Sequence, residues 1–217
     1  MTDMLKNIPL FANLSEADLA KLESHAVTKT FPKNSIIINE GDTTDSLYIT
    51  VSGKVKAFLR NERDKEVILS IQGPGEYFGE IALLDEAPRS ASVMTLENSS
   101  FLIITQASFR ACLGEHPDIA ISLIRGLTHR VRALTDSVKS LALEDVYGRI
   151  AKTLSHLAQE EDGKLIIRGK LTQQDIAAMV GASREMVSRI FKDLTAGGYI
   201  KIEDKKITLE KKLPARW

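Results

Sequence analysis

The N-terminal hundred residues alternate between short apolar runs and clusters of turn-forming residues. From Val27 to about Ile104 this pattern is typical of strands rather than helices. The expected strands are residues 28–31, 35–39, 47–51, 55–60, 66–71, 91–96 and 101–104. Turn signals that contain Gly, Asn, Asp or Pro separate them. Regular short strands of this kind predict a small β-barrel or β-roll.

From Pro117 the apolar period changes to that of a helix. Apolar residues recur at spacings of three and four at Ile124, Leu127, Val131, Leu134, Val138 and Leu141. This heptad pattern has β-branched residues at position a and leucine at position d, which favours two parallel helices and therefore a homodimer. Asp145 and Gly148 stand where the pattern would continue. Their positions predict a hinge near residues 142–145.

Beyond the hinge a second group of elements is expected. An amphipathic helix from Asp145 to about Gln159 leads to a turn at residues 160–163 and a strand at 165–168. The chain is therefore divided into a β-roll domain (residues 1–116), a dimerisation helix with its hinge (117–144) and a second domain (145–217).

The second domain contains the spacing of a helix-turn-helix. Thr172 and Ser183 are suitable N-caps for two helices, and Gly181 breaks the chain between them. Two further runs, residues 197–202 and 206–209, are expected to form a wing hairpin.

Composition and charge narrow the class of function. The chain has 217 residues, 43% of them apolar, and no net charge. Residues 164–217 contain 12 Lys and Arg but 6 Asp and Glu, whereas the preceding residues contain more acidic than basic side chains. The basic C-terminal part is therefore expected to bind phosphate groups.

No apolar run approaches the roughly 20 residues of a membrane span, and no secretory signal begins the chain, which favours a cytoplasmic protein without membrane contact. The single cysteine, Cys112, disfavours an iron–sulfur cluster.

The most specific chemical signal lies between Gly75 and Ala91. Glu80 precedes Arg89 by nine residues, and a short helix is expected between them. Arginine presents a rigid fork of donors that matches phosphate oxygens, whereas a carboxylate accepts from hydroxyl groups. Gly79 lets the backbone approach a ligand closely. These residues suit a cyclic nucleotide, and a surface ion pair across a turn is the alternative interpretation.

This run resembles the phosphate-binding cassette of cyclic-nucleotide-binding domains, as found in the catabolite activator protein (CRP/FNR) family of transcription regulators. The resemblance implies that Glu80 binds the ribose, that Arg89 and Ser90 bind the cyclic phosphate, and that cAMP is the allosteric ligand. The ligand-binding residues implied by the cassette are Gly79, Glu80, Ile81, Ala82, Arg89, Ser90 and Ala91.

In the same family the long helix covers the nucleotide. Arg130 and Thr135 flank the heptad seam, and Thr135 matches the residue that reaches the nucleotide of the other subunit. Leu134 departs from the family pattern, since the best-known member has threonine at this position. The resemblance therefore implies that this chain makes one hydrogen bond fewer to the adenine. All three are implied ligand-binding residues. The ligands left open are cGMP, cyclic di-GMP, a gas bound to haem, or none.

The second helix of the helix-turn-helix resembles the recognition helix of this family. The pattern Ser-Arg-Glu-x-Val-x-Arg is complete from Ser183 to Arg189. Arginine can donate twice to guanine and glutamate can accept from cytosine, so the helix is expected to read the major groove of an inverted repeat of the TGTGA type. The implied DNA-binding residues are Thr172, Gln174, Ser183, Arg184, Glu185, Ser188 and Arg189.

The combined prediction is an α+β protein with a jelly-roll-like double-stranded β-roll, a long dimerisation helix and a winged helix-turn-helix. Its expected function is that of a dimeric, cAMP-responsive regulator that binds double-stranded DNA and contacts RNA polymerase, without a metal. An enzyme of the cupin type is the alternative from another class. Such metal sites need clustered histidines and carboxylates on the strands, and residues 27–104 contain no histidine.

Overall fold

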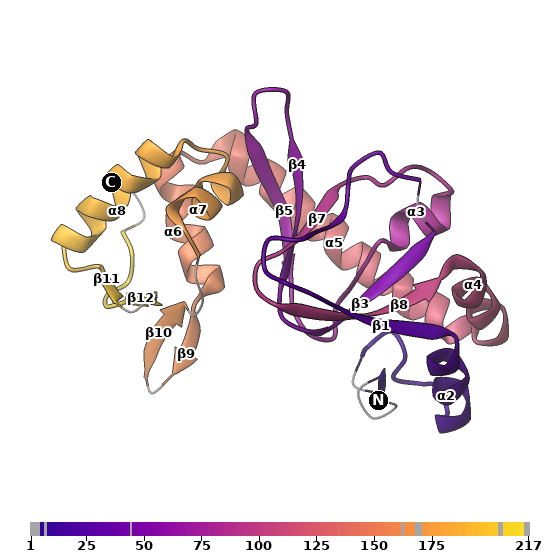
Figure 1. The fold of residues 1–217 in the computed structure, drawn as a ribbon. Coiled ribbons are helices and arrows are strands. Elements are labelled where there is room, and N and C mark those ends of the chain that lie inside the picture. Colours follow the sequence, from indigo (N-terminus) through magenta and orange to yellow (C-terminus); the bar gives the residue numbers. More distant parts are fainter. Residues whose placement is uncertain are drawn as a thin grey trace. The chain divides into compact units, whose positions relative to one another are not determined.

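The computed structural model describes residues 5–6, 8–43, 45–161, 163–167, 171–203 and 206–214 (Figure 1). The expected α+β fold is confirmed. The chain divides into two compact units: the first unit comprises residues 1–59 and 69–132, and the second comprises residues 60–68 and 133–217. The domain boundaries expected from the sequence remain a prediction.

Two four-stranded sheets form the β-roll (Figure 1). The first sheet has the order β1 (Ala26–Phe31), β8 (Ser99–Thr105), β3 (Ser46–Ser52) and β6 (Tyr77–Phe78). The second has the order β2 (Ile36–Ile38), β7 (Ser92–Thr95), β4 (Val55–Arg60) and β5 (Glu66–Gln72). All seven predicted strands occur, with ends within two residues of the prediction. The sequence pattern missed β6, because two residues are too few to show a period.

The two central strands of the first sheet, β8 and β3, carry buried residues on both faces. Successive side chains of β8 point to opposite sides, so Phe101 packs between the two sheets while Leu102 packs against the helices. Between the sheets, Tyr48 stacks on Phe78 with ring centroids 5.1 Å apart, and Phe78 meets Phe101 edge-on at 5.4 Å. Such aromatic pairs add to the energy of burial and hold β6 against β3.

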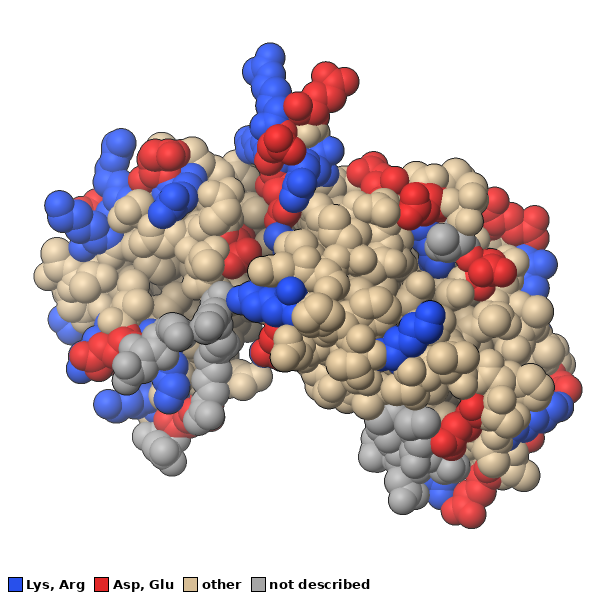
Figure 2. Space-filling model, viewed as in Figure 1, with Lys and Arg blue, Asp and Glu red and all other residues tan. Residues whose placement is uncertain are grey.

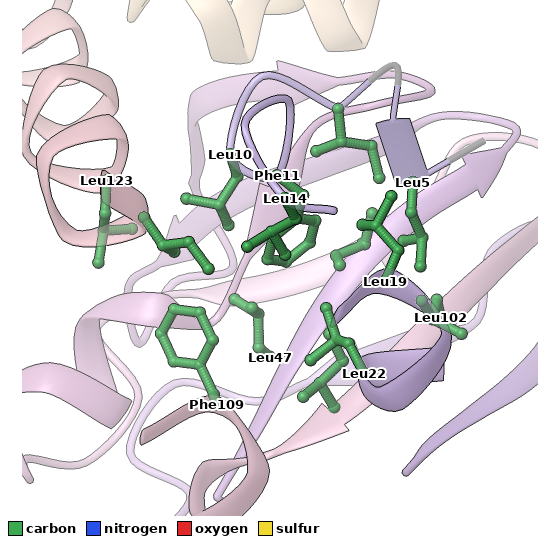
Figure 3. Close-up of a cluster of buried hydrophobic side chains, with 14 of the residues drawn as sticks. Leu5, Leu10, Phe11, Leu14, Leu19, Leu22, Leu47, Leu102, Phe109 and Leu123 are labelled. Carbon is green, nitrogen blue, oxygen red and sulfur yellow. The ribbon is translucent and has the colours of Figure 1, made fainter. Parts of the chain in front are cut away.

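Helices cover the outer face of the first sheet (Figures 1 and 3). They are α2 (Glu16–Ser24), α4 (Gln106–Glu115) and the beginning of α5 (Pro117–Leu143). Figure 3 shows Leu47 of β3 among Phe109 of α4, Leu22 of α2 and Leu123 of α5, and all four are buried. Helix α4 was not predicted, because its first turns continue directly from β8 and its apolar pattern is weak. The resulting core anchors α5 to the β-roll.

Helix α5 is 27 residues long and presents an exposed apolar stripe. Ile124, Val131 and Val138, the predicted a positions, are 57, 62 and 65% exposed. Leu127 differs, since it packs partly against the core of the first unit. The heptad pattern is therefore mostly a surface feature of the single chain.

The second unit contains the helix-turn-helix and a small sheet. Its helices are α6 (Val146–Leu157), α7 (Gln173–Val180) and α8 (Arg184–Ala196). Its sheet has the order β11 (Ile200–Glu203), β12 (Lys206–Leu209), β10 (Lys164–Ile167) and β9 (Gln159–Glu161). The wing hairpin formed by β11 and β12 was predicted and is confirmed.

One part of the connection differs from the prediction. Glu160 and Glu161 were expected in a turn, but they lie in β9 and pair with Leu165 and Lys164 of β10. Polar composition suggested a turn, whereas the two residues in fact form an exposed edge strand. The last residue of the predicted strand at 165–168 lies outside the described residues. At the expected hinge, α5 ends at Leu143 and α6 begins at Val146.

Candidate functional site

The cassette, residues 75–91, contains α3 (Glu80–Asp85), the short helix expected from the sequence. Gly79 is its N-cap residue and has φ of 84°, in the left-handed region that favours glycine. A Cβ at this position would lie 2.5 Å from Nη1 of Arg89 and 3.0 Å from the carbonyl oxygen of Ser46. Gly79 is therefore required both by its backbone conformation and by the close approach of the Arg89 side chain.

Arg89 is buried, with only 3% of its surface exposed. Its Nη1 donates to the carbonyl oxygen of Gly79 at 2.6 Å, and its Nη2 donates to the carbonyl oxygen of Ser46 at 2.7 Å. Burial lowers the pKa of the guanidinium, although an arginine remains charged at any physiological pH. The side chain thus ties α3 to β3 while it holds a positive charge beneath the surface of the cassette.

Glu80 is the most deeply buried carboxylate of the cassette, with 1% of its surface exposed. Its Oε1 forms an ion pair with Arg130, whereas its Oε2 has no hydrogen-bond partner among the described residues. Burial raises the pKa of this carboxyl, and the charges of Arg130 and Arg89 act against that rise. A buried carboxylate oxygen without a donor is costly, and a ligand hydroxyl would supply the missing hydrogen bond. The residues therefore fit a ribose.

Arg130 connects this carboxylate to the long helix. Besides Glu80, its guanidinium donates through Nη2 to the carbonyl oxygen of Tyr77 at 2.5 Å and lies over the Tyr77 ring at 4.9 Å. Gln72 donates to the same carbonyl oxygen at 3.3 Å. Tyr77 was not among the predicted site residues. The motif around Gly79 contains it, but nothing in the local sequence indicates that Arg130 folds back onto it.

The remaining predicted ligand-binding residues occupy different surroundings. Ala82 is buried, Ile81 is 42% exposed, Ser90 is exposed and Ala91 is half-buried. Leu134 and Thr135 lie further along α5, on the part of the helix that belongs to the second unit, and both are exposed. The structure therefore brings Gly79, Glu80, Arg89 and Arg130 into one connected network within the first unit.

The helix-turn-helix presents its predicted reading face to solvent. Helices α7 and α8 pack through Ile176, Ala177, Val180, Val187, Phe191 and Leu194, all of which are buried. Arg184, Glu185, Ser188 and Arg189 are exposed along α8. The pKa of Glu185 is lowered, first by its backbone hydrogen bond and then by that from Ser183, so it remains an acceptor near neutral pH. The face thus offers two guanidinium groups and one carboxylate.

The side chains of the two predicted N-caps, Thr172 and Ser183, form hydrogen bonds within the first turns of their own helices. Thr172 and Asp175 form a reciprocal capping box at the start of α7, and the hydroxyl of Ser183 accepts from the backbone N–H of Met186 at 3.2 Å. Gln174 is exposed. In Figure 2, Lys and Arg side chains project from the surface around α8 with Asp and Glu side chains beside them, and the β4–β5 hairpin likewise bears both signs of charge.

A cavity of about 270 Å³ lies between α2 and α4. None of the cassette residues lines this cavity. Leu22, Ala111 and Cys112 form its walls together with the ion pair of Lys21 and Glu115. Over the described ranges, no three His, Cys, Asp or Glu side chains gather where they could hold a metal ion. Within the same ranges, no helix has the length and apolarity needed to cross a bilayer.

Two protein families match this chain. Residues 28–116 match the cyclic nucleotide-binding domain, and residues 148–212 match the Crp-like helix-turn-helix domain. The CRP-like cAMP-activated global transcriptional regulator of Mycobacterium tuberculosis is 33% identical over 213 residues, which cover 96% of this chain and 95% of that protein. The cAMP-activated global transcriptional regulator CRP of Salmonella typhimurium is 35% identical over 190 residues, or 86% of this chain and 90% of that protein.

Solved structures of similar regulators also match this chain. The structure of the c-di-GMP responsive global regulator CLP of Xanthomonas campestris superimposes with a TM-score of 0.79 at 25% identity, covering 91% of this chain and 100% of that chain. The catabolite activator protein of Thermus thermophilus superimposes with a TM-score of 0.56 at 29% identity, covering 93% of each chain. These similarities extend over both units.

Proposed function

Because the chain belongs to the CRP/FNR family of transcription regulators, we propose that it acts as a homodimer that binds cAMP and, in response, binds an inverted DNA repeat of the TGTGA type. Family membership makes it a transcription regulator with a cyclic-nucleotide-binding domain and a DNA-binding helix-turn-helix, rather than an enzyme. The identity of the ligand, the residues that hold it and the DNA sequence are the proposal.

The unpartnered oxygen of Glu80 carries the ligand half of the proposal. Its Oε2 is buried without a donor, and the cationic side chain of Arg89 lies close enough to influence its pKa. Glu80 would accept from the ribose hydroxyl. Arg89 would turn from the carbonyl oxygens of Gly79 and Ser46 toward the cyclic phosphate, with exposed Ser90 beside it. Gly79, Ile81, Ala82 and Ala91 would form the walls.

cAMP is the preferred ligand because two of the similar regulators are described as cAMP-activated. Cyclic di-GMP is the second candidate, since a structurally similar regulator is described as c-di-GMP responsive. Leu134 cannot donate or accept through its side chain, so base selectivity would depend more on Thr135 of the same helix. Calorimetry with cAMP, cGMP and cyclic di-GMP separates the three.

The DNA half rests on the exposed face of α8. Arg184 and Arg189 would donate to guanine and Glu185 would accept from cytosine, with Ser188 beside them. Thr172, Gln174 and Ser183, at the beginnings of the two helices, would contact phosphates through side chains or through backbone N–H groups.

The exposed stripe of α5 supports the dimer. Val131, Leu134, Val138 and Leu141 are 44–65% exposed, and such an apolar stripe at heptad spacing fits a second copy of the same helix. A dimer would place two recognition helices on successive major-groove faces about 34 Å apart. Ligand would act by binding the DNA-competent arrangement of the hinge at residues 142–145 more tightly than the resting one. Such a regulator would work in the cytoplasm together with RNA polymerase.

Titration of cAMP into the purified protein, with a fluorescent TGTGA palindrome as probe, tests the proposal. The expected result is DNA affinity that rises with cAMP and a dimer in analytical ultracentrifugation. Equal DNA affinity with and without each of the three nucleotides would overturn the ligand half. Equal affinity for the palindrome and a scrambled duplex would overturn the DNA half.

A further inference from the structure

The middle of α5 carries a glycine where the helix meets the β-roll. Gly126 lies within α5, and a Cβ there would overlap the hydroxyl oxygen of Tyr77 and lie 3.5 Å from its Cζ. The phenol therefore sits directly on the backbone of the helix, in a notch that any larger residue would close. A glycine inside a helix lowers helix stability, so its presence at a close contact indicates a packing role.

Tyr77 is held at its other end by the cassette network. It lies in β6, where it pairs with Ile49 of β3, and its ring packs partly against the core of the first unit. Its carbonyl oxygen accepts from Arg130 and Gln72, and the Arg130 guanidinium covers its ring. One residue thus touches α5 at two points: its hydroxyl meets Gly126, and its ring and carbonyl meet Arg130 one turn later.

We propose that Tyr77 and Gly126 are positioning residues that fix the register of α5 against the β-roll and so hold Arg130 on Glu80. The contact chain runs from Gly126 to Tyr77, from Tyr77 to Arg130, and from Arg130 to the Glu80 carboxylate. Displacement of either partner moves the guanidinium away from that carboxylate. The consequence for ligand affinity rests on the proposed function, because it requires a ligand that binds at Glu80.

A methyl group at position 126 is expected to weaken the Glu80–Arg130 ion pair whether α5 or the Tyr77 side chain moves to make room for it. If Gly126→Ala pushes α5 outward, Arg130 moves with the helix. If the phenol swings aside instead, Arg130 loses the ring that it covers, and the two bonds to the Tyr77 carbonyl are strained. Both responses weaken the ion pair of Glu80.

A double-mutant cycle isolates this contact. The variants are Gly126→Ala, Tyr77→Phe and the two combined, with Gly114→Ala as the matched control, since that glycine also lies in a helix but a Cβ there would have no neighbouring atom within 4 Å. Phenylalanine lacks the oxygen that overlaps the new methyl group and leaves the ring carbon at ordinary contact distance. The cycle therefore tests the hydroxyl-to-helix contact and not the loss of a glycine in general.

The measurements are cAMP affinity by calorimetry and the midpoint of thermal unfolding. We expect Gly126→Ala to weaken cAMP binding about tenfold and to lower the midpoint, although alanine favours a helix. Tyr77→Phe should weaken binding less, and the combined variant should recover most of the loss. Gly114→Ala should bind as the wild type does. The pH below which binding weakens should rise in Gly126→Ala, because the Glu80 carboxyl would lose Arg130 and keep only Arg89 nearby.

Wild-type affinity in Gly126→Ala, or no recovery in the combined variant, would overturn this inference. Failure of the wild-type protein to bind any cyclic nucleotide would instead overturn the proposed function. The thermal midpoints would then still show whether Tyr77 and Gly126 are coupled, since that readout needs no ligand.

Discussion

The cassette and the recognition helix use the same residue types in opposite surroundings. Glu80 and Arg89 of the cassette are 1% and 3% exposed. Glu185, Arg184 and Arg189 of α8 are exposed to solvent. In the cassette, burial makes each charge depend on its partners, so a substitution affects folding as well as binding. On α8, water solvates the charges, so a substitution affects what the helix binds and leaves the fold intact.

The two regions should also differ in their response to salt. Phosphate contacts release counterions, so DNA affinity falls steeply as salt rises. Buried pairs are screened much less than exposed charges. The ligand affinity of the cassette is therefore expected to change less with ionic strength than the DNA affinity does.

The largest expected effect follows from removal of the buried arginine. Arg89→Ala leaves the carbonyl oxygens of Gly79 and Ser46 without their donors and removes the predicted phosphate ligand. We expect the free energy of unfolding to fall by about 2–4 kcal/mol and the cAMP response of operator binding to disappear, while the dimer remains. Urea denaturation and the anisotropy titration measure these two effects.

Arg184→Ala is the matched control for that variant, because it removes the same side chain from an exposed position. Its free energy of unfolding should lie within about 0.5 kcal/mol of the wild-type value. A cAMP response retained by Arg89→Ala would refute the role assigned to Arg89. Equal destabilisation by the two variants would refute the contrast between the regions.

An intermediate effect is expected on base discrimination. Glu185→Ala should reduce the preference for the cognate half-site by about 1–3 kcal/mol and leave the salt-dependent part of the affinity in place. Competition between cognate and scrambled duplexes measures the preference. Gln174→Ala serves as the comparison, since loss of a phosphate contact should weaken binding to both duplexes alike. Unchanged discrimination in Glu185→Ala would show that α8 does not read the DNA through this residue.

The smallest expected effect is on the pH dependence of stability, to which Glu80 and Glu185 should contribute with opposite signs. Burial raises the pKa of folded Glu80 above its ordinary value of 4.5, so its contribution to stability is most favourable below that pH and falls as the pH rises through the raised pKa. The pKa of Glu185 is lowered, so its contribution is present above 4.5 and is lost as the pH falls through the lowered pKa.

Glu80→Gln should therefore gain stability relative to the wild type as the pH rises above 4.5, whereas Glu185→Gln should show a weak trend of the opposite sign. Denaturation midpoints measured across this range check both trends. Parallel curves for wild type and Glu80→Gln would mean that the carboxyl of Glu80 titrates as it does in the unfolded chain.

The local pattern of apolar and polar residues predicted the elements that are long enough to show a helical or strand period. Strand β4 was predicted with its observed ends, Val55 and Arg60, and the helix-turn-helix was predicted with both of its caps, Thr172 and Ser183. It failed for the two-residue β6, for α4 and for the polar edge strand β9. β6 pairs with the distant strand β3, α4 packs Phe109 into the core of the first unit, and β9 pairs with the adjacent strand β10. Pairing and packing, rather than composition, decide these three elements.

The order of residues along the chain was sufficient to identify the heptad stripe, the cassette and the recognition helix, because each is encoded by spacings of a few residues. Packing alone brought Arg89 to Ser46, 43 positions away, and Arg130 to Glu80, 50 positions away. It also left one oxygen of Glu80 without a donor and set Tyr77 on Gly126. Contacts of this kind depend on how a helix lies on a sheet, and no short stretch of sequence records that geometry.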